Sequence, residues 1–337
     1  MGQWQTERMK TSTLQGLLIL LLACPILGEN YPGTSRVQLL SYPNCIQLEN
    51  ETTKVVLGHH RGGRVLAYSY RGHNALYLDP QEAQWVPGSK QKLPVSAGRF
   101  DIGPEKIIPP RPELWSGPWK AEITGARSAR LTSPEHPRTG TQLVRTFRLD
   151  AEGSHLACTQ IIRNISDSTI EWCHWSRTFA EGQGICVIPL SEVSRFPKHY
   201  VMYEPGNLIN IAPKQDSIRV REGYLEITGA PRYPKLGMDS LEGWFAYQMK
   251  SDLLFVKKYQ TYPDRVYNEV AGLTISIWYP DGPMCELEPI GPRQKLEPGE
   301  AAAFTEHWFL HPNPYPGDGK LLDLSAVADL AEASKVD

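Results

Sequence analysis

The stretch that decides the fold is TQIIRNISDSTIEWCHW, which runs from Thr159 to Trp175. Its first half is an apolar run typical of a β-strand, and this strand ends in Arg-Asn-Ile-Ser-Asp at Asp167. After a turn, the chain re-enters a second strand that carries His174 near its middle. Two strands joined by so short a connection pair antiparallel, so the stretch predicts a β-hairpin.

The rest of the sequence repeats this pattern of short strands separated by turn residues. In Leu273–Ile277, aliphatic and polar residues alternate, as in a half-buried antiparallel strand. Helical periodicity is convincing only near the end, where Ala-rich residues follow the N-cap candidates Asp323 and Ser325. So many strands with so little helix predict an all-β fold in which two large antiparallel sheets pack as a β-sandwich, with a short C-terminal helix.

The sandwich is expected to be a single domain over residues 36–312, followed by a tail at 313–337 that contains the helix. One part of the domain differs in composition. Residues 79–119, called the proline-rich segment below, hold eight prolines and three tryptophans. Proline removes a ladder hydrogen bond, so this segment cannot be central sheet. It is either a lid over a binding site or a surface loop.

Residues 1–28 are expected to be an export signal. Arg8 and Lys10 precede an apolar run, Leu17–Leu27, that is too short to span a bilayer as a helix. Two processing routes remain open: cleavage after Gly28, or cleavage before Cys24 with lipidation of that cysteine. The first predicts a periplasmic protein, and the second a membrane-anchored lipoprotein of a bacterial cell envelope.

Composition and motifs exclude several functional classes. The chain of 337 residues has a formal net charge of −2, so a nucleic-acid partner is not expected. The sequence contains no G-x-S-x-G, P-loop, H-E-x-x-H or dinucleotide-binding motif and no Cys-x-x-Cys pair. No cofactor and no metal site are therefore predicted.

Four parts of the sequence together resemble the galactose mutarotase-like (aldose 1-epimerase) superfamily over roughly residues 50–311. The first is the hairpin described above, which is similar to the superfamily's T-x-T-x-x-N-x-S-D … N-H-x-Y-F hairpin, although Cys-His-Trp replaces Asn-His-x-Tyr-Phe. The other three are the Gly-Gly-Arg strand at 59–66, the Cys-Glu-Leu-Glu strand at 282–289 and the Pro-Gly-Glu close at 296–310. Residues 97–105 are similar to an uncharacterised bacterial exported branch.

This resemblance implies a large sandwich, or supersandwich, that binds a carbohydrate and interconverts its anomers. The reaction needs an acid at the ring oxygen and a base at the anomeric hydroxyl. The resemblance places His174 as the acid and Glu288 as the base. Without it, a buried structural histidine and a solvated glutamate are the ordinary interpretations. The alternative function is a non-catalytic glycan-binding or accessory protein of the envelope.

Further residues are expected to contact the sugar, which the near-neutral net charge predicts to be uncharged. Glu286 lies two residues before Glu288 and hence on the same strand face, so it is either the acting carboxylate or an acceptor for sugar hydroxyls. The guanidinium groups of arginines beside glycines suit sugar oxygens, and tryptophan suits sugar C–H faces. The remaining candidates for substrate binding are Arg64, Arg99, Asp101, Trp175 and Lys235.

Overall fold

A computed structural model describes residues 31–88, 92, 94–317 and 320–336. The expected signal at 1–28 and the lipidation candidate Cys24 lie outside the described residues and remain predictions. Among the described residues, no helix is both long enough and apolar enough to cross a membrane.

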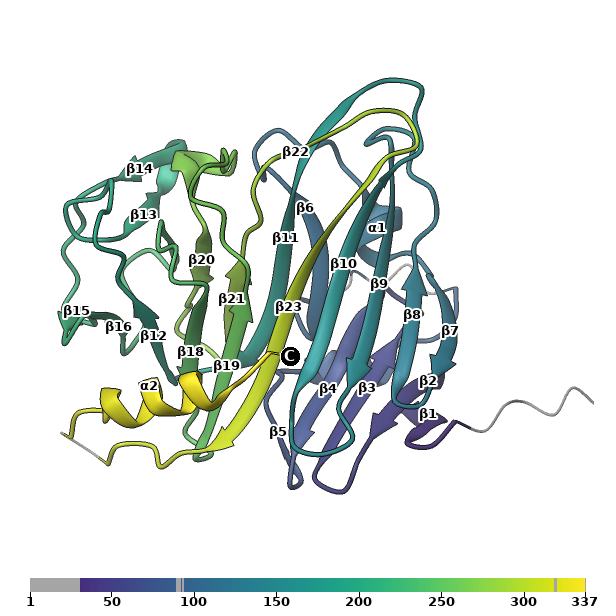
Figure 1. Ribbon diagram of the computed structural model, residues 1–337, viewed down its shortest axis with the longest axis horizontal. Coiled ribbons are helices and arrows are strands. Elements are labelled where there is room, and N and C mark those ends of the chain that lie inside the picture. The colour runs from purple at the N-terminus through teal and green to yellow at the C-terminus, as the bar shows by residue number, and fades with distance from the viewer. Residues whose placement is uncertain (1–30, 89–91, 93, 318–319, 337) are drawn as a thin grey trace, which may run out of the picture. The chain divides into compact units, whose positions relative to one another are not determined.

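The fold is all-β, as predicted, and consists of two antiparallel sheets that face each other (Figure 1). The first has thirteen strands, eleven of which lie in the order β1-β2-β3-β4-β6-β11-β21-β20-β17-β13-β14, while β5 pairs with β4 and β22 with β11. Its strands are β1 (Thr34–Leu39), β2 (Tyr42–Glu49), β3 (Thr53–Gly58), β4 (Arg64–Tyr70), β5 (His73–Asn74), β6 (Gly98–Gly103), β11 (Ile170–Glu181), β13 (Val201–Glu204), β14 (Leu208–Asn210), β17 (Lys235–Met238), β20 (Ile275–Trp278), β21 (Met284–Pro289) and β22 (Gln294–Leu296).

The second sheet has ten strands in the order β15-β16-β12-β18-β19-β23-β10-β9-β8-β7. Its strands are β7 (Lys120–Gly125), β8 (Ser128–Thr132), β9 (Thr141–Leu149), β10 (Leu156–Asn164), β12 (Ile185–Pro189), β15 (Ile218–Arg221), β16 (Tyr224–Ile227), β18 (Trp244–Gln248), β19 (Leu253–Tyr259) and β23 (Ala301–Pro312). Short 3-10 turns occur at η1 (Pro80–Gln84), η2 (Pro205–Asn207) and η3 (Val270–Gly272). The β-hairpin predicted at Thr159–Trp175 is wrong. Its first strand, β10, pairs with β9 and β23 in this sheet, whereas its second, β11, pairs with β6, β21 and β22 in the other, so the short connection between them crosses from one sheet to the other.

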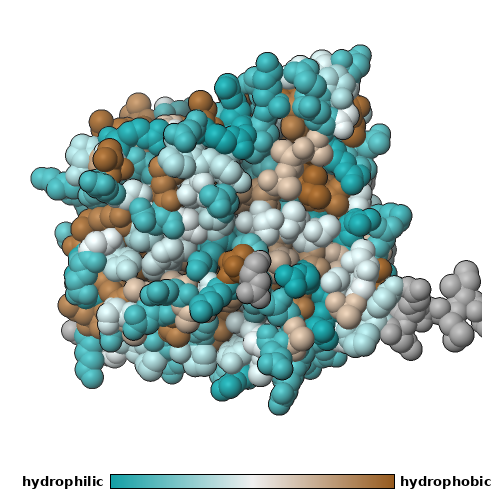
Figure 2. Space-filling view, viewed as in Figure 1, coloured by the Kyte–Doolittle hydropathy of each residue, from teal (hydrophilic) through white to brown (hydrophobic). Residues whose placement is uncertain are grey.

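Successive residues of a strand point to opposite faces of its sheet, so every second residue can face the other sheet. The apolar residues that do so form the main core between the two sheets. In β21, for example, Cys285 and Leu287 belong to this core, while Glu286 and Glu288 point to the outer face. Figure 2 shows that the face of the molecule seen in Figure 1 is mostly hydrophilic, with small apolar groups scattered over it.

The predicted C-terminal helix is confirmed as α2 (Leu324–Ala333). It begins where expected, since the Asp323 carboxylate accepts a hydrogen bond from the backbone N–H of Ala326. Leu324, Val327 and Ala331 pack it against apolar residues on the outer face of the ten-stranded sheet.

The prediction that the proline-rich segment cannot be central sheet is wrong for β6, which lies wholly within the segment and pairs with β4 and β11, because its six residues contain no proline. The rest of the segment lies outside both sheets and includes the short helix α1 (Pro112–Ser116). It packs closely over the Gly-Gly pair that precedes β4. A Cβ on Gly62, whose φ is +79°, would lie 2.1 Å from the Trp115 carbonyl oxygen, and one on Gly63 would lie 2.3 Å from the Trp119 ring. Glycine at both positions therefore makes room for α1 and for Trp119, which precedes β7.

Candidate functional site

Charged and aromatic side chains gather on the outer face of the thirteen-stranded sheet, where β6, β11, β21, β20, β17 and β13 lie side by side. The register sets the neighbours: Trp175 is opposite Asp101, Arg177 opposite Arg99, and Ser276 opposite Glu288. Because these residues alternate with core residues, their side chains all project away from the ten-stranded sheet.

Arg177 is at the centre of this site and holds two carboxyl groups. Its Nε donates to Glu286 Oε1 at 2.7 Å and to Glu288 Oε1 at 3.1 Å, and its Nη2 donates to Glu286 Oε2 at 3.3 Å. Glu286 is 1% exposed and Glu288 is 0% exposed. One guanidinium therefore pairs with two buried carboxyl groups.

The arginine itself lies between two indole rings. Its Cζ is 4.9 Å from the centre of the Trp115 ring, which belongs to α1, and 4.6 Å from that of Trp175 on β11. These two cation–π contacts help to hold the guanidinium in place beside the carboxyl groups. Sequence reasoning missed Arg177, although its position two residues after Trp175 places it on the same strand face.

The two carboxyl groups differ in acidity. Burial raises the pKa of Glu286 to about 8; the Arg177 charge opposes this increase, and the charge of Glu288 adds to it. Burial also disfavours the charged form of Glu288, but the positive charges of Lys235 and Arg177 outweigh it and lower the pKa of that carboxyl group. At neutral pH the pair therefore holds one proton, which is on Glu286.

Lys235 closes one side of the site. Its Nζ lies 2.6 Å from Glu105 Oε2, 4.8 Å from the centre of the Trp175 ring and 5.5 Å from that of Tyr203 on β13. Although burial alone would lower it, the nearby charges of Glu288 and Glu105 raise the pKa of Lys235, which stays protonated at neutral pH.

A cavity of about 290 Å³ opens beside Arg177. Asp101 and Arg111 form part of its wall, with Arg111 Nε donating to Asp101 Oδ1 at 2.6 Å. The remaining wall comes from α1 and the residues before it. The lining residues are Asp101, Pro110, Arg111, Pro112, Trp115 and Arg177. The proline-rich segment thus covers this part of the face.

The structure does not bring His174 and Glu288 together. His174 points into the sandwich, where its Nε2 lies 3.1 Å from the Ala302 carbonyl oxygen and its ring stacks with Phe100 and Phe304. It is 0% exposed, and burial lowers its pKa to about 4. The sheet itself separates it from Glu288, so the acid–base pair expected from the sequence is not assembled on one face.

Arg64 and Arg99 anchor the proline-rich segment and do not line the cavity. The Arg64 guanidinium binds both carboxylate oxygens of Glu82, which is fully buried. Arg99 donates to the carbonyl oxygens of Trp115, Ser96 and Pro94 at 2.9, 3.3 and 3.3 Å.

Five expected site residues therefore gather around Arg177: Asp101, Trp175, Lys235, Glu286 and Glu288. The sequence also gave no indication of Arg111, Glu105 or Tyr203. Within the described residues, no cluster of three or more His, Cys, Asp or Glu side chains is arranged to hold a metal ion. The site can offer a protonated and an ionised carboxyl group, two cations and aromatic rings.

Together, this architecture and site define a β-supersandwich that carries a charged, aromatic pocket on its larger sheet. The fold is that of galactose mutarotase-like proteins, as solved structures show. A putative mutarotase, YeaD from Salmonella typhimurium, is similar with a TM-score of 0.56 at 10% identity, over 86% of this chain and 97% of that one. A galactose mutarotase-like protein from Lactobacillus casei gives 0.55 at 11% identity, over 79% of this chain and 100% of that one.

The Slr1438 protein from Synechocystis sp. PCC 6803 is also similar, with a TM-score of 0.56 at 14% identity, over 83% of this chain and 100% of that one. No protein-family model matches the sequence. No curated protein matches it either. At such low identity the likeness establishes the fold, and the arrangement of this chain's own side chains carries the functional argument.

Proposed function

We propose that this protein binds a neutral aldose on the outer face of the thirteen-stranded sheet and interconverts its anomers, with Glu286 and Glu288 as the acid–base pair. The observation that carries the proposal is the pair of buried carboxyl groups whose pKa values are shifted in opposite directions beside Arg177 and Lys235. Pairs of titratable groups driven apart in this way are typical of acid–base sites.

The chemistry follows from the protonation states. Glu286, as the carboxylic acid, gives its proton to the ring oxygen, while the Glu288 carboxylate takes the proton of the anomeric hydroxyl. The bond from C1 to the ring oxygen breaks, and an open-chain aldehyde forms. After rotation about the C1–C2 bond, the 5-hydroxyl attacks the other face of the aldehyde. Its proton goes back to Glu286, and the new anomeric oxygen takes back the proton held by Glu288.

Arg177 and Lys235 contribute positive charge where oxygen atoms gain negative charge during the reaction. Both carboxyl groups lie beneath Arg177, so a sugar reaches them when Arg177 and α1, which carries Trp115, move aside. Trp115 and Tyr203, both partly exposed at the edge of the site, then offer aromatic faces to sugar C–H groups.

The proposal predicts a defined pH dependence. Exchange needs Glu286 protonated and Glu288 ionised. The rate should fall as pH rises through about 8, where Glu286 loses its proton, and should also fall in acid when Glu288 gains one. The rate plateau between these limits includes neutral pH.

The test is NMR exchange spectroscopy on freshly dissolved α-D-glucose and α-D-galactose. Wild-type protein should speed anomer exchange, and Glu288→Gln and Glu286→Gln should each abolish the enhancement. Glu152→Gln, which changes an exposed carboxylate far from the site, is the matched control and should leave the rate unchanged. A wild-type rate equal to that of buffer alone would eliminate the catalytic proposal.

A second candidate function is carbohydrate binding without turnover. The complete burial of both carboxyl groups under Arg177 favours it, because a binding site needs no access to them. It predicts saturable binding of the same sugars by calorimetry, retained in Glu288→Gln, with no exchange in any variant.

We also propose that the protein is exported, on the basis of the signal-like sequence of residues 1–28. Cell fractionation with intact-mass measurement tests it. A chain that begins at Glu29 supports cleavage after Gly28, and a lipid mass on an N-terminal Cys24 supports the lipoprotein route. A full-length chain in the cytosolic fraction would contradict both.

A further inference from the structure

Three side chains on the outer face of the ten-stranded sheet form a hydrogen-bonded chain. His155 Nδ1 lies 2.8 Å from Asp150 Oδ2, and His155 Nε2 lies 2.9 Å from Nδ1 of His307 on β23. The His155 ring is fixed by stacking on Phe309, with ring centres 4.5 Å apart and planes 6° from parallel. Neither histidine belongs to the site on the other sheet.

The chain determines which nitrogen of each uncharged ring carries a proton. A carboxylate only accepts, so His155 donates from Nδ1 to Asp150, which leaves His155 Nε2 as an acceptor. His307 must then donate from Nδ1 to His155. Its own Nε2 is left with a free lone pair, and no hydrogen bond from that atom to a described residue is recorded.

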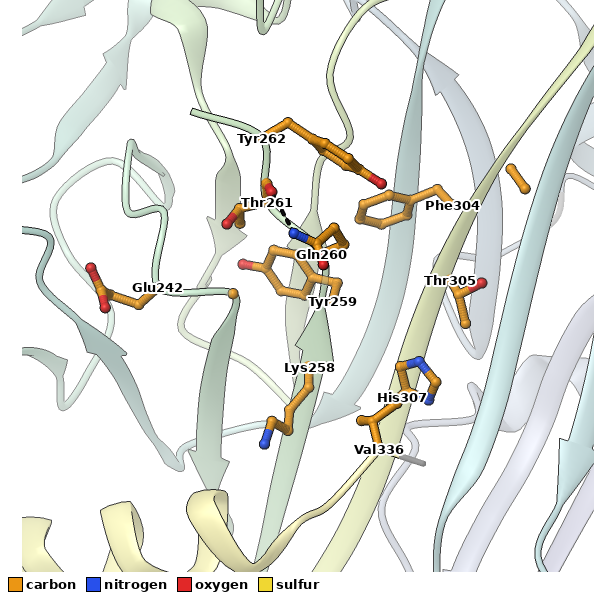
Figure 3. A pocket seen from close by; sticks show the side chains of 12 residues that line it. Glu242, Lys258, Tyr259, Gln260, Thr261, Tyr262, Phe304, Thr305, His307 and Val336 are labelled. Atoms are coloured by element: carbon orange, nitrogen blue, oxygen red, sulfur yellow. Dashed lines mark hydrogen bonds between the residues drawn. The ribbon is translucent and has the colours of Figure 1, made fainter. Parts of the chain in front are cut away.

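His307 lines a pocket of about 490 Å³ beyond the end of α2. Figure 3 shows its ring between Thr305 and Val336, with Tyr262 and Phe304 on the far side of the pocket. Lys258 also lines it, but its ammonium group donates to the carbonyl oxygens of Ala331 and Ser334, at 3.1 and 2.8 Å, at the C-terminal end of α2. The positive charge of Lys258 is therefore directed to the helix end.

We propose that this pocket is a second ligand site, which takes a neutral saccharide or polyol whose hydroxyl group donates to His307 Nε2. His307 offers its Nε2 as an acceptor without a recorded partner, Thr305 offers a hydroxyl group, and Tyr262 offers an aromatic ring. Together these groups suit a ligand with alternating O–H and C–H groups. The site lies on the other sheet, and the inference does not depend on the proposed function.

Electrostatics agree with a neutral ligand. Burial, together with the neighbouring His155, lowers the pKa of His307 to about 4. The ring therefore stays uncharged at neutral pH and offers no cation to an anionic ligand. So weak a base is also unsuited to abstract a proton, so His307 is assigned a role in binding and not in catalysis.

Long-range ¹H–¹⁵N NMR of the full chain tests both parts of the proposal. In the free protein, His307 should carry its proton on Nδ1. In His155→Phe, which keeps a ring against Phe309, the proton of His307 should move to Nε2. His73→Phe, at the exposed first residue of β5, is the matched control and should leave the His307 signals unchanged. A proton on His307 Nε2 in the wild type would overturn the proposal.

The ligand probe is methyl α-D-glucopyranoside, whose blocked anomeric carbon prevents turnover at the first site. Titration should shift the His307 Nε2 signal saturably in wild type and in Glu288→Gln, and in His307→Phe the glycoside should no longer shift the signals of Thr305 and Tyr262 in this pocket. The absence of a saturable shift would refute the second site. A shift that disappears in Glu288→Gln would assign the binding to the first site, and a response to ethylammonium alone would refute a neutral ligand.

Discussion

Replacement of Arg177 by methionine should make the stability of the protein depend steeply on pH. Methionine keeps the long apolar stem between Trp115 and Trp175 but removes the charge shared by Glu286 and Glu288. Glu286 is protonated at neutral pH in the wild type, so the change falls mainly on Glu288, which is ionised and fully buried.

The magnitude can be worked from the contacts. Loss of the cation–π contacts costs about 0.5–2 kcal/mol at any pH. Without Arg177, Lys235 still opposes the effect of burial, but the pKa of Glu288 in the folded variant rises relative to that in the folded wild type. The loss of unfolding free energy relative to the wild type therefore grows as pH rises, by up to about 1.4 kcal/mol per unit, over the interval between these two pKa values. The total loss should reach about 3–5 kcal/mol at pH 8, as for other broken buried pairs.

Urea denaturation of wild type and variant at pH 5 and pH 8 measures this difference. The variant should be moderately less stable at pH 5 and much less stable at pH 8. The double variant Arg177→Met/Glu288→Gln is the control, because an amide does not titrate, and it should lose the extra pH dependence. An equal loss of stability at both pH values would refute an ionised Glu288 beneath the guanidinium.

Three further changes test the remaining parts of the molecule. Lys257→Met should cost about 3–5 kcal/mol in urea denaturation, because it leaves the Glu306 carboxylate unpaired in the sandwich interior, and adding Glu306→Gln should recover most of that loss. His174→Phe should cost only the hydrogen bond to a backbone carbonyl, about 0.5–1.5 kcal/mol, and any anomer exchange measured by NMR should persist; loss of exchange in a folded variant would count against the site described above. Arg64→Met should leave buried Glu82, whose pKa its partners hold at about 2, without its main cation, so that limited proteolysis cuts the proline-rich segment faster at pH 7; an unchanged digestion pattern would show that this ion pair does not anchor the segment.

The fold could be predicted from the sequence because most strands alternate between core and outer residues. The face of each site residue could not always be predicted, and His174 shows why. Most of β11, including Cys173, His174 and Trp175, is buried, because the proline-rich segment and neighbouring loops cover its outer side. When both faces of a strand are buried, apolar and polar residues no longer alternate along it, so the sequence does not show which residues face the core. An error of one residue in this assignment then moves a side chain from the site to the core.

The arginines raise a similar difficulty. A lone arginine beside glycine is compatible with sugar binding, and only the fold reveals that Glu82 lies over Arg64 and that loop carbonyls surround Arg99. In both cases the arginine's partners lie in the irregular proline-rich segment. Such a segment has no periodic pattern from which these contacts could be predicted. Arg177 could have been found, because it shares a strand face with Trp175.

Charge pairing explains why the candidate site lies at Arg177 and not at the other arginines of this face. Arg64 pairs with Glu82, which also lies 3.9 Å from a guanidinium nitrogen of Arg61, and Arg111 pairs with Asp101. Arg177 faces two buried carboxyl groups. Even with the positive charge of Lys235 nearby, burial keeps Glu286 protonated, so this is a place where the fold maintains an acid beside a base. Holding an extra carboxyl group in a dry site costs stability, and we infer that its function lies in the proton it holds.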